Sequence, residues 1–104
     1  MIGKAEFSVV HLEKVDENTM IVGGRCNVTS VKLGHVFTCL YFPVMYRDEM
    51  RIRTIGKKII EELEVKVESI CYYGKELDKV DVGMSASLKV IGDVNHLQLG
   101  HVLM

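Results

Sequence analysis

The chain has 104 residues, enough to enclose one hydrophobic core but not two, so we expect a single domain over residues 1–104. Its apolar fraction of 48% is typical of a soluble globular protein, and it lacks the run of about 18 apolar residues that would span a bilayer. Thirteen Lys and Arg residues against 14 Asp and Glu residues leave a formal net charge of -1, which excludes a global electrostatic attraction to nucleic acid.

The N-terminus and the cysteines indicate a cytoplasmic protein with reduced thiols. Residues 1–17 contain no uninterrupted apolar stretch and no small-residue cleavage site, so they do not resemble a secretory signal. The three cysteines are widely spaced and include no CxxC pair, which argues against a disulfide framework and against a zinc site. We therefore expect Cys26, Cys39 and Cys71 to be reduced, buried thiols.

The first half of the chain shows patterns typical of β-strands. Phe7, Val9 and His11 alternate with other residues near the N-terminus, which predicts a strand with one buried face. Residues 20–46 hold short apolar clusters that glycines interrupt, which favours short strands over a helix. Pro43 lies in the last of these clusters and indicates a kinked or edge strand, and an edge strand can pair with a second copy of the chain.

Residues 47–63 fit two different structures. Four apolar residues recur at spacings of three, four and four, as on one face of an amphipathic helix: Ile52, Ile55, Ile59 and Leu63. Gly56 interrupts that face, and a hairpin that turns at residues 55–58 (IGKK) fits equally well. We expect a helical or hairpin insertion between better-defined strands.

The second half predicts two more strands. Strict alternation places one set of residues on a common face of the first strand: Leu63, Val65, Val67, Ser69 and Cys71. In the second strand, Ala86, Leu88 and Val90 alternate with polar neighbours. Short strands, regular glycine turns and a single proline indicate an all-β fold, a small closed antiparallel β-barrel of six to seven strands.

The tetrapeptide LGHV occurs twice, at residues 33–36 and 99–102. Both copies fit a position where a strand turns at glycine and resumes with a valine on the inside, with His35 and His101 on the solvent side. Zinc binding by these two histidines would need two more ligands, and no HxH, HxxxH or HExxH pattern supplies them. We expect a repeated turn, not a metal site.

No local arrangement of residues predicts catalysis or cofactor binding. Residues 56–58 (GKK) and 74–76 (GKE) lack the upstream glycine and the Ser or Thr of a phosphate-binding loop, so we expect no nucleotide site. An enzymatic alternative would need the fold to bring Cys71 to His96 or His101 as a nucleophile and base. We expect a protein without enzymatic activity.

The order of the motifs carries a family resemblance. A Gly-Arg pair opens one strand and a Lys-x-Gly turn closes the next, at Gly24, Arg25, Lys32 and Gly34. A Val-x-Ser-Ile strand, glycine turns and a closing Gly-x-Val follow, at Val67, Ser69, Ile70, Gly83, Leu88, Gly92, Gly100 and Val102. This ordered set resembles the β-barrel second domain of translation GTPases, and it is most similar to the selenocysteine-specific and initiation-factor members. The resemblance covers most of the chain outside roughly residues 40–63 and implies a free-standing barrel without a GTPase domain.

The resemblance also implies a binding function. In that family the barrel contacts the aminoacylated end of tRNA or ribosomal RNA, and the position of Glu68 corresponds to a strand of the aminoacyl-end pocket; its alternative role is the solvent face of that strand. The insertion adds a basic patch, for which the alternative is an ordinary solvated surface: Arg47, Arg51, Arg53, Lys57 and Lys58. We expect a binding or adaptor module with a protein partner, or alternatively an accessory protein that binds tRNA or rRNA.

Overall fold

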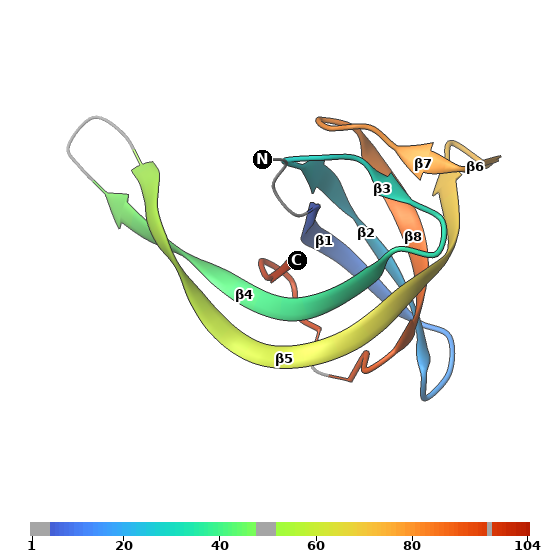
Figure 1. The fold of residues 1–104 in the computed structure, drawn as a ribbon, viewed down its shortest axis with the longest axis horizontal. Coiled ribbons are helices and arrows are strands. Elements are labelled where there is room, and N and C mark those ends of the chain that lie inside the picture. The colour runs from blue at the N-terminus through green and yellow to red at the C-terminus, as the bar shows by residue number, and fades with distance from the viewer. Residues whose placement is uncertain (1–4, 48–51, 96) are drawn as a thin grey trace.

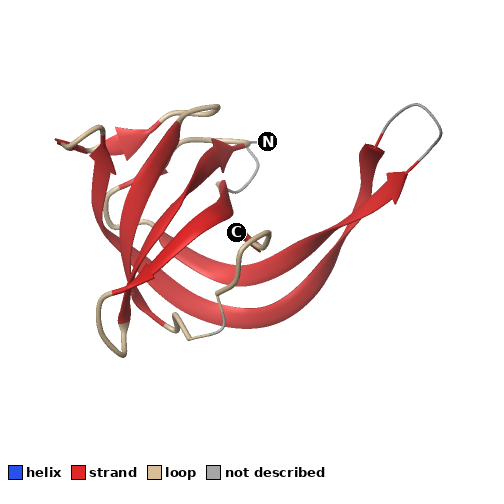
Figure 2. Cartoon of the chain, turned by 180° about the vertical axis from the view of Figure 1, so that it is seen from behind, coloured by secondary structure: helices blue, strands red, loops and turns tan. Residues whose placement is uncertain are grey.

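The computed structural model describes residues 5–47, 52–95 and 97–104, and for residues 43–47 and 52–61 it describes the backbone. These residues form strands without any helix (Figures 1 and 2). The strands are β1 (Glu6–Lys14), β2 (Thr19–Asn27), β3 (Val31–Lys32), β4 (Val36–Arg47), β5 (Ile52–Tyr72), β6 (Lys75–Leu77), β7 (Lys79–Val80), β8 (Ser85–Gly92) and β9 (Val102–Leu103). The prediction of an all-β fold is confirmed.

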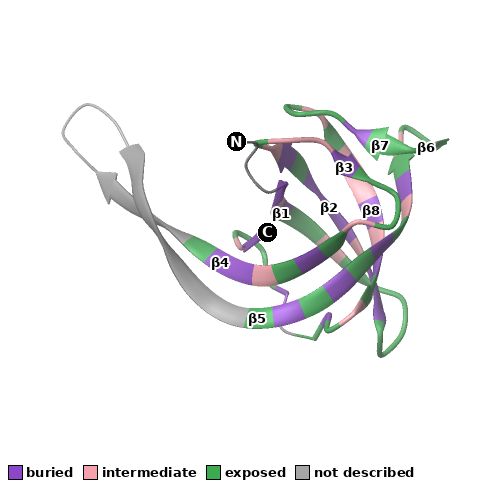
Figure 3. Cartoon of the chain, viewed as in Figure 1, coloured by how far each residue is buried: buried purple, intermediate pink, exposed green. Residues whose placement is uncertain are grey.

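Six of these strands close into an antiparallel ring in the order β4-β9-β1-β2-β8-β5, which the β4–β5 pairing completes (Figure 1). β6 adds to the free side of β5, and β3 and β7 form a separate two-stranded sheet. The ring encloses the core, whose largest fully buried side chains include Phe7, Phe37, Leu40, Ile70, Leu88 and Leu103 (Figure 3). The predicted closed antiparallel architecture is therefore correct.

The ring closes at its shortest strand. β9 pairs with β1 through Phe7 and Ser8 and with β4 through Leu40 and Tyr41. A buried hydrogen bond spans this seam, because the Tyr41 hydroxyl donates to Glu6 Oε1 over 2.8 Å. Burial and the neighbouring carboxylate raise the pKa of Tyr41, so this hydroxyl remains a donor.

Two β-bulges change which residues face the core. The register shifts between Val9 and His11 in β1 and between Val67 and Ser69 in β5. Each bulge adds one residue and reverses the alternation beyond it, so that Ile70 is fully buried and Cys71 is exposed. The predictions that Cys71 and His11 face the core are wrong for this reason, whereas Phe7, Val9, Leu88 and Val90 are buried as predicted.

In the described part of residues 47–63, β5 pairs with the end of β4 in a hairpin arm, and the helical alternative is wrong. β4 and β5 extend together away from the ring as a curved two-stranded ribbon (Figure 1). Arg47 pairs with Ile52 and Val44 pairs with Gly56, so residues 55–58 lie within a paired strand and do not form the predicted turn. The isoleucines suit a strand, and pairing with β4 outweighs their helical spacing. Pro43 lies beyond the part of β4 that pairs with β9, on an edge as predicted.

The two LGHV segments form equivalent turns. Gly34 N donates to Val67 O over 2.9 Å, and Gly100 N donates to Val9 O over 2.9 Å. In return, Val67 N donates to the carbonyl of His35 over 2.8 Å, and Val9 N donates to the carbonyl of His101 over 2.9 Å. Val9 and Val67 each precede a bulge, so both turns dock on the same feature of a neighbouring strand.

This equivalence extends around the ring. Residues 19–37 in one half correspond to residues 85–103 in the other, with β1 corresponding to β5, β2 to β8 and β9 to β4. The pair Phe37↔Val65 between β4 and β5 corresponds to the pair Leu103↔Phe7 between β9 and β1. The pair Val22↔Leu88 lies at the centre, where the two residues correspond to each other. The ring therefore has an approximate internal two-fold symmetry, and the repeated tetrapeptide marks its two related turns.

The environment of the LGHV turns differs in part from the prediction. Gly34 and Gly100 have φ values of 83° and 87°, as expected for glycine turns. Val102 is buried, but Val36 is exposed and Phe37 occupies the core instead. The histidines are half-buried, not on the solvent side, because His35 packs edge-on against Phe37 at 4.6 Å and His101 packs edge-on against Phe42 at 6.0 Å.

Candidate functional site

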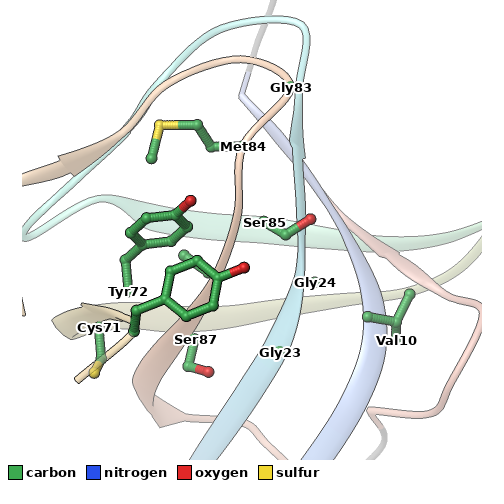
Figure 4. A pocket seen from close by; sticks show the side chains of 11 residues that line it. Val10, Gly23, Gly24, Cys71, Tyr72, Gly83, Met84, Ser85 and Ser87 are labelled. Atoms are coloured by element: carbon green, nitrogen blue, oxygen red, sulfur yellow. The ribbon is translucent and has the colours of Figure 1, made fainter. Parts of the chain in front are cut away.

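A pocket of about 570 Å³ opens on the outer face of the ring where β1, β2, β8 and the end of β5 meet (Figure 4). We call it the tyrosine pocket. Its lining residues are Val10, Gly23, Gly24, Cys71, Tyr72, Tyr73, Gly83, Met84, Ser85, Ala86 and Ser87. None of them carries a charged side chain, and a pocket of this size is within the range of small-molecule and side-chain sites.

Two glycines without side chains, Gly23 and Gly24, form the floor of the tyrosine pocket. Gly23 and Gly24 of β2 pair with Ser87 and Ala86 of β8, and Figure 4 shows the two glycines between Val10 on one side and Tyr72 and Met84 on the other. A Cβ on Gly24 would lie 1.8 Å from Ser8 O, so β1 crosses too closely for any other residue. Val10 is the extra residue of the β1 bulge and is 68% exposed.

Two adjacent tyrosines form the wall of the pocket. The rings of Tyr72 and Tyr73 lie edge to face with centroids 4.4 Å apart. Tyr72 pairs with Lys75, which leaves Tyr73 and Gly74 as a two-residue hairpin turn with φ values of 48° and 79°. Positive φ at both positions is the requirement of a type I′ turn, where Asn-Gly is the usual sequence. Tyr73 is 89% exposed, so it presents an uncovered aromatic ring.

The lining chemistry suits binding more than proton transfer. The polar groups in the lining are the hydroxyls of Ser85, Ser87 and the two tyrosines, together with the Cys71 thiol. Among the described lining residues there is no histidine and no carboxylate that could act as a base for Cys71. A cation lies at the rim, because Arg25 Nη2 is 3.9 Å from the place of a Cβ on Gly83.

The predicted basic patch lies on the arm, away from the tyrosine pocket. The backbones of Arg47, Arg53, Lys57 and Lys58 lie in the paired strands of the arm, and Arg51 lies outside the described residues. Cross-strand pairing sets Lys57 opposite Pro43 and Lys58 opposite Phe42. The described basic positions therefore lie on one ribbon.

Glu68 belongs to a different surface. It is the extra residue of the bulge in β5, a strand of the ring, and its side chain is exposed. Its Oε2 lies 3.9 Å from Lys89 Nζ. It lines a second, acidic hollow with Leu33, Ser69, Ile70, Glu76, Leu77 and Asp78. Glu68 therefore does not join the basic residues in one site.

Cys26 is buried and Cys39 is half-buried, so the prediction that all three cysteines are buried holds for Cys26 alone. Burial raises the pKa of Cys26, whose Sγ donates to Thr29 O over 3.1 Å, so this thiol is unreactive. Burial lowers the pKa of His35, which keeps this imidazole neutral near pH 7. Of the predicted histidine partners of Cys71, His101 lies in the turn before β9, and His96 lies outside the described residues.

The described residues contain neither a candidate metal site nor a membrane-spanning helix. Within the described ranges, no three His, Cys, Asp or Glu side chains are grouped so that they could hold a metal ion. In the same part of the chain, the structure contains no helix of the length and apolar character needed to cross a bilayer.

The tyrosine pocket was not predicted from the sequence. Its lining comes from four separate segments that the ring closure brings together, and charge patterns do not mark it. One signal was present: the segment YYGK places an aromatic residue directly before glycine in a tight turn. That turn position usually carries a small polar residue.

Comparisons with known proteins show a similarity of fold. No protein-family model and no curated protein matches the sequence. Two solved structures of translation elongation factor SelB from Methanococcus maripaludis, one in complex with the GTP analogue GppNHp and one in the apo form, each match with a TM-score of 0.68 and 17% sequence identity. Each match covers 95% of this chain and 18% of the SelB chain. The resemblance predicted from the motifs is therefore confirmed at the level of the fold: this chain is folded like one part of a translation elongation factor.

Proposed function

We propose that the chain is a non-enzymatic binding module of the translation apparatus, cytoplasmic, which docks a protein partner on the tyrosine pocket. The uncharged lining of that pocket is the observation that carries the proposal. Tyr and Met are enriched in the centres of protein interfaces, and charged residues are depleted there. The fold similarity to a translation elongation factor supports the setting in translation.

Exposed apolar groups at the pocket support a protein partner. Tyr73 and Val10 are 89% and 68% exposed, although each belongs to a structured strand or turn. Covering them would remove apolar area from water, at about 25 cal/mol per Å². A partner that inserts an apolar side chain between them would gain the most.

Retention of proteins from an extract of the native cells tests this proposal. The immobilised chain should retain a protein that stays bound at about 0.5 M salt, because apolar contacts are not screened by ions. Val10→Glu should abolish this retention, since it places a carboxylate in the pocket. Val15→Glu is the matched control: Val15 is also exposed and apolar but does not line the pocket, so this variant should behave as the wild type.

Equal retention by the wild type and Val10→Glu would refute docking on the tyrosine pocket. Loss of retention in both variants would also count against it, because Val15 lies outside the site.

Binding of tRNA or rRNA by the arm is the second candidate function. Its support is the extension of β4 and β5 beyond the ring, which presents a ribbon whose sequence includes Arg47, Arg53, Lys57 and Lys58 (Figure 1). Arginine suits bidentate contacts with phosphate, and such contacts release counterions on binding.

This candidate predicts strong dependence on salt and on charge. Retained RNA should dissociate as salt rises from about 50 to 200 mM, and the double variant Arg51→Glu/Arg53→Glu should retain less RNA than the wild type at every salt concentration. If the wild type holds no RNA at about 50 mM salt, the arm is not an RNA-binding element.

A further inference from the structure

We propose that the tyrosine pocket binds an uncharged aromatic or aliphatic side chain of an extended peptide segment, with Tyr73 as the residue that determines affinity. The inference rests on the proposed function and specifies the chemistry of the ligand. Two independent observations carry it: a comparison between the two halves of the ring, and the backbone conformation of Tyr73.

The internal symmetry provides a comparison surface for the pocket. The bulge residue Val10 corresponds to Glu68, and Gly23 corresponds to Lys89, because both pairs occupy the same place in the matching registers. Glu68 and Lys89 form an ion pair of 3.9 Å across the strands. The same register therefore carries an ion pair at one place and the uncharged Val10 and Gly23 of the pocket at the related place.

The residues that pair with Gly23 and Lys89 also differ in size, and the smaller one is again at the pocket. Ser87, which pairs with Gly23, corresponds to Ile21, which pairs with Lys89. Around the pocket, the smaller side chain stands at both positions. The floor of the pocket therefore results from these side-chain choices, and its wall comes from the β5–β6 hairpin that holds Tyr72 and Tyr73.

Tyr73 occupies a conformation that disfavours its side chain. Among the described residues, Tyr73 and Val28 are the two non-glycine residues with positive φ, at 48° and 75°. This conformation is unfavourable for most L-residues, and Asn or Gly would remove much of the strain. Tyr73 is also 89% exposed, so core packing does not compensate for the strain. A binding role explains why an aromatic ring occupies this turn.

The charges around the pocket select the class of ligand. A site for nucleic acid needs a positive groove that follows the phosphates, and none of the lining residues is charged. Arg25 is a single cation at the Gly83 rim. A cationic side chain would lose its hydration in the pocket without gaining an ionic partner among the lining residues, and an anionic one would find Arg25 only at the rim. An uncharged side chain can instead pack on the glycine floor against Tyr72, Tyr73 and Met84, while the serine hydroxyls bond to its peptide groups.

Titration of the chain with N-acetyl-L-phenylalaninamide, followed by NMR of the backbone amides, tests the inference. The probe should shift the amide signals of Gly24, Ser85 and Ser87 in the wild type. N-acetyl-L-lysinamide and uridine 5′-monophosphate should shift them less at equal concentration. Tyr73→Asn should weaken binding of the first probe by about fivefold, as expected for the loss of one aromatic contact. The same variant should raise the melting temperature, since Asn suits the turn.

Val28→Asn is the matched control. Val28 also has a positive φ and is 53% exposed, but it does not line the pocket. This variant should leave the affinity for N-acetyl-L-phenylalaninamide unchanged. The inference is overturned if Tyr73→Asn binds this probe as tightly as the wild type, if Val28→Asn weakens binding equally, or if either charged probe binds more tightly.

The two proposals can fail separately. Protein retention that is sensitive to Val10→Glu, with no binding of N-acetyl-L-phenylalaninamide, would overturn the ligand class and leave the docking function intact. Binding of the probe by the wild type without retention of any protein would overturn the docking function and support the ligand chemistry of the site.

Discussion

At the scale of single residues, three glycines illustrate two different requirements of the backbone. Gly34 and Gly100 have positive φ in the two related turns, and a Cβ at either position would meet no atom within 4 Å. Gly24 has an ordinary φ, but a Cβ there would lie 1.8 Å from Ser8 O. The first two positions need glycine for its conformation, and the third needs it for space.

Alanine substitutions should separate these requirements. Gly34→Ala and Gly100→Ala should each lower the free energy of unfolding by about 1 kcal/mol, the cost of a left-handed conformation without a clash. Gly24→Ala should cost several times more, because β1 and β2 must separate to admit the methyl group. Urea denaturation measures all three changes. A loss at Gly24→Ala no larger than at Gly34→Ala would contradict the close approach of the two strands.

Residue burial was predictable from the sequence only up to each bulge. Alternation correctly placed Phe7, Val9, Leu88 and Val90 in the core. Alternation gave the wrong face for Cys71, which follows a bulge. A bulge depends on how two strands pair, and the sequence of one strand does not show its register with the other. The exposed thiol follows from that single extra residue.

At the scale of elements, the arm and the repeated turns show which patterns sufficed. The LGHV repeat predicted two equivalent turns, and the hydrogen bonds of Gly34 and Gly100 confirm them. Residues 47–63 left helix and hairpin open, because the spacing of the isoleucines fits a helix and their β-branched side chains fit a strand. Pairing with β4 settles this choice, and such long-range pairing is not encoded in the segment itself.

The candidate site was harder to predict than the fold. The basic residues of the arm are close in sequence, so a charge pattern finds them. The tyrosine pocket joins Val10, Gly23, Tyr73 and Ser87, which lie in four strands or turns. Only closure of the ring makes them neighbours. The Tyr-Gly turn was the local signal, and its meaning depends on the surface that Tyr73 faces.

At the scale of the whole molecule, the ring consists of two halves that share their registers but differ in surface chemistry. The Glu68–Lys89 ion pair lies at one of two related positions, and the uncharged Val10 and Gly23 of the tyrosine pocket lie at the other. This difference supports the proposed binding function, because the shared register does not itself require an uncharged floor.

The most direct test of this account is photo-crosslinking from the pocket in the native cell. The photoreactive residue p-benzoyl-L-phenylalanine replaces Tyr73 in one variant and Val15 in the other. We predict a covalent adduct with one protein from position 73 and no such adduct from position 15. An adduct with RNA from position 73, the same protein adduct from both positions, or no adduct from position 73 would contradict the proposal that the tyrosine pocket docks a protein partner.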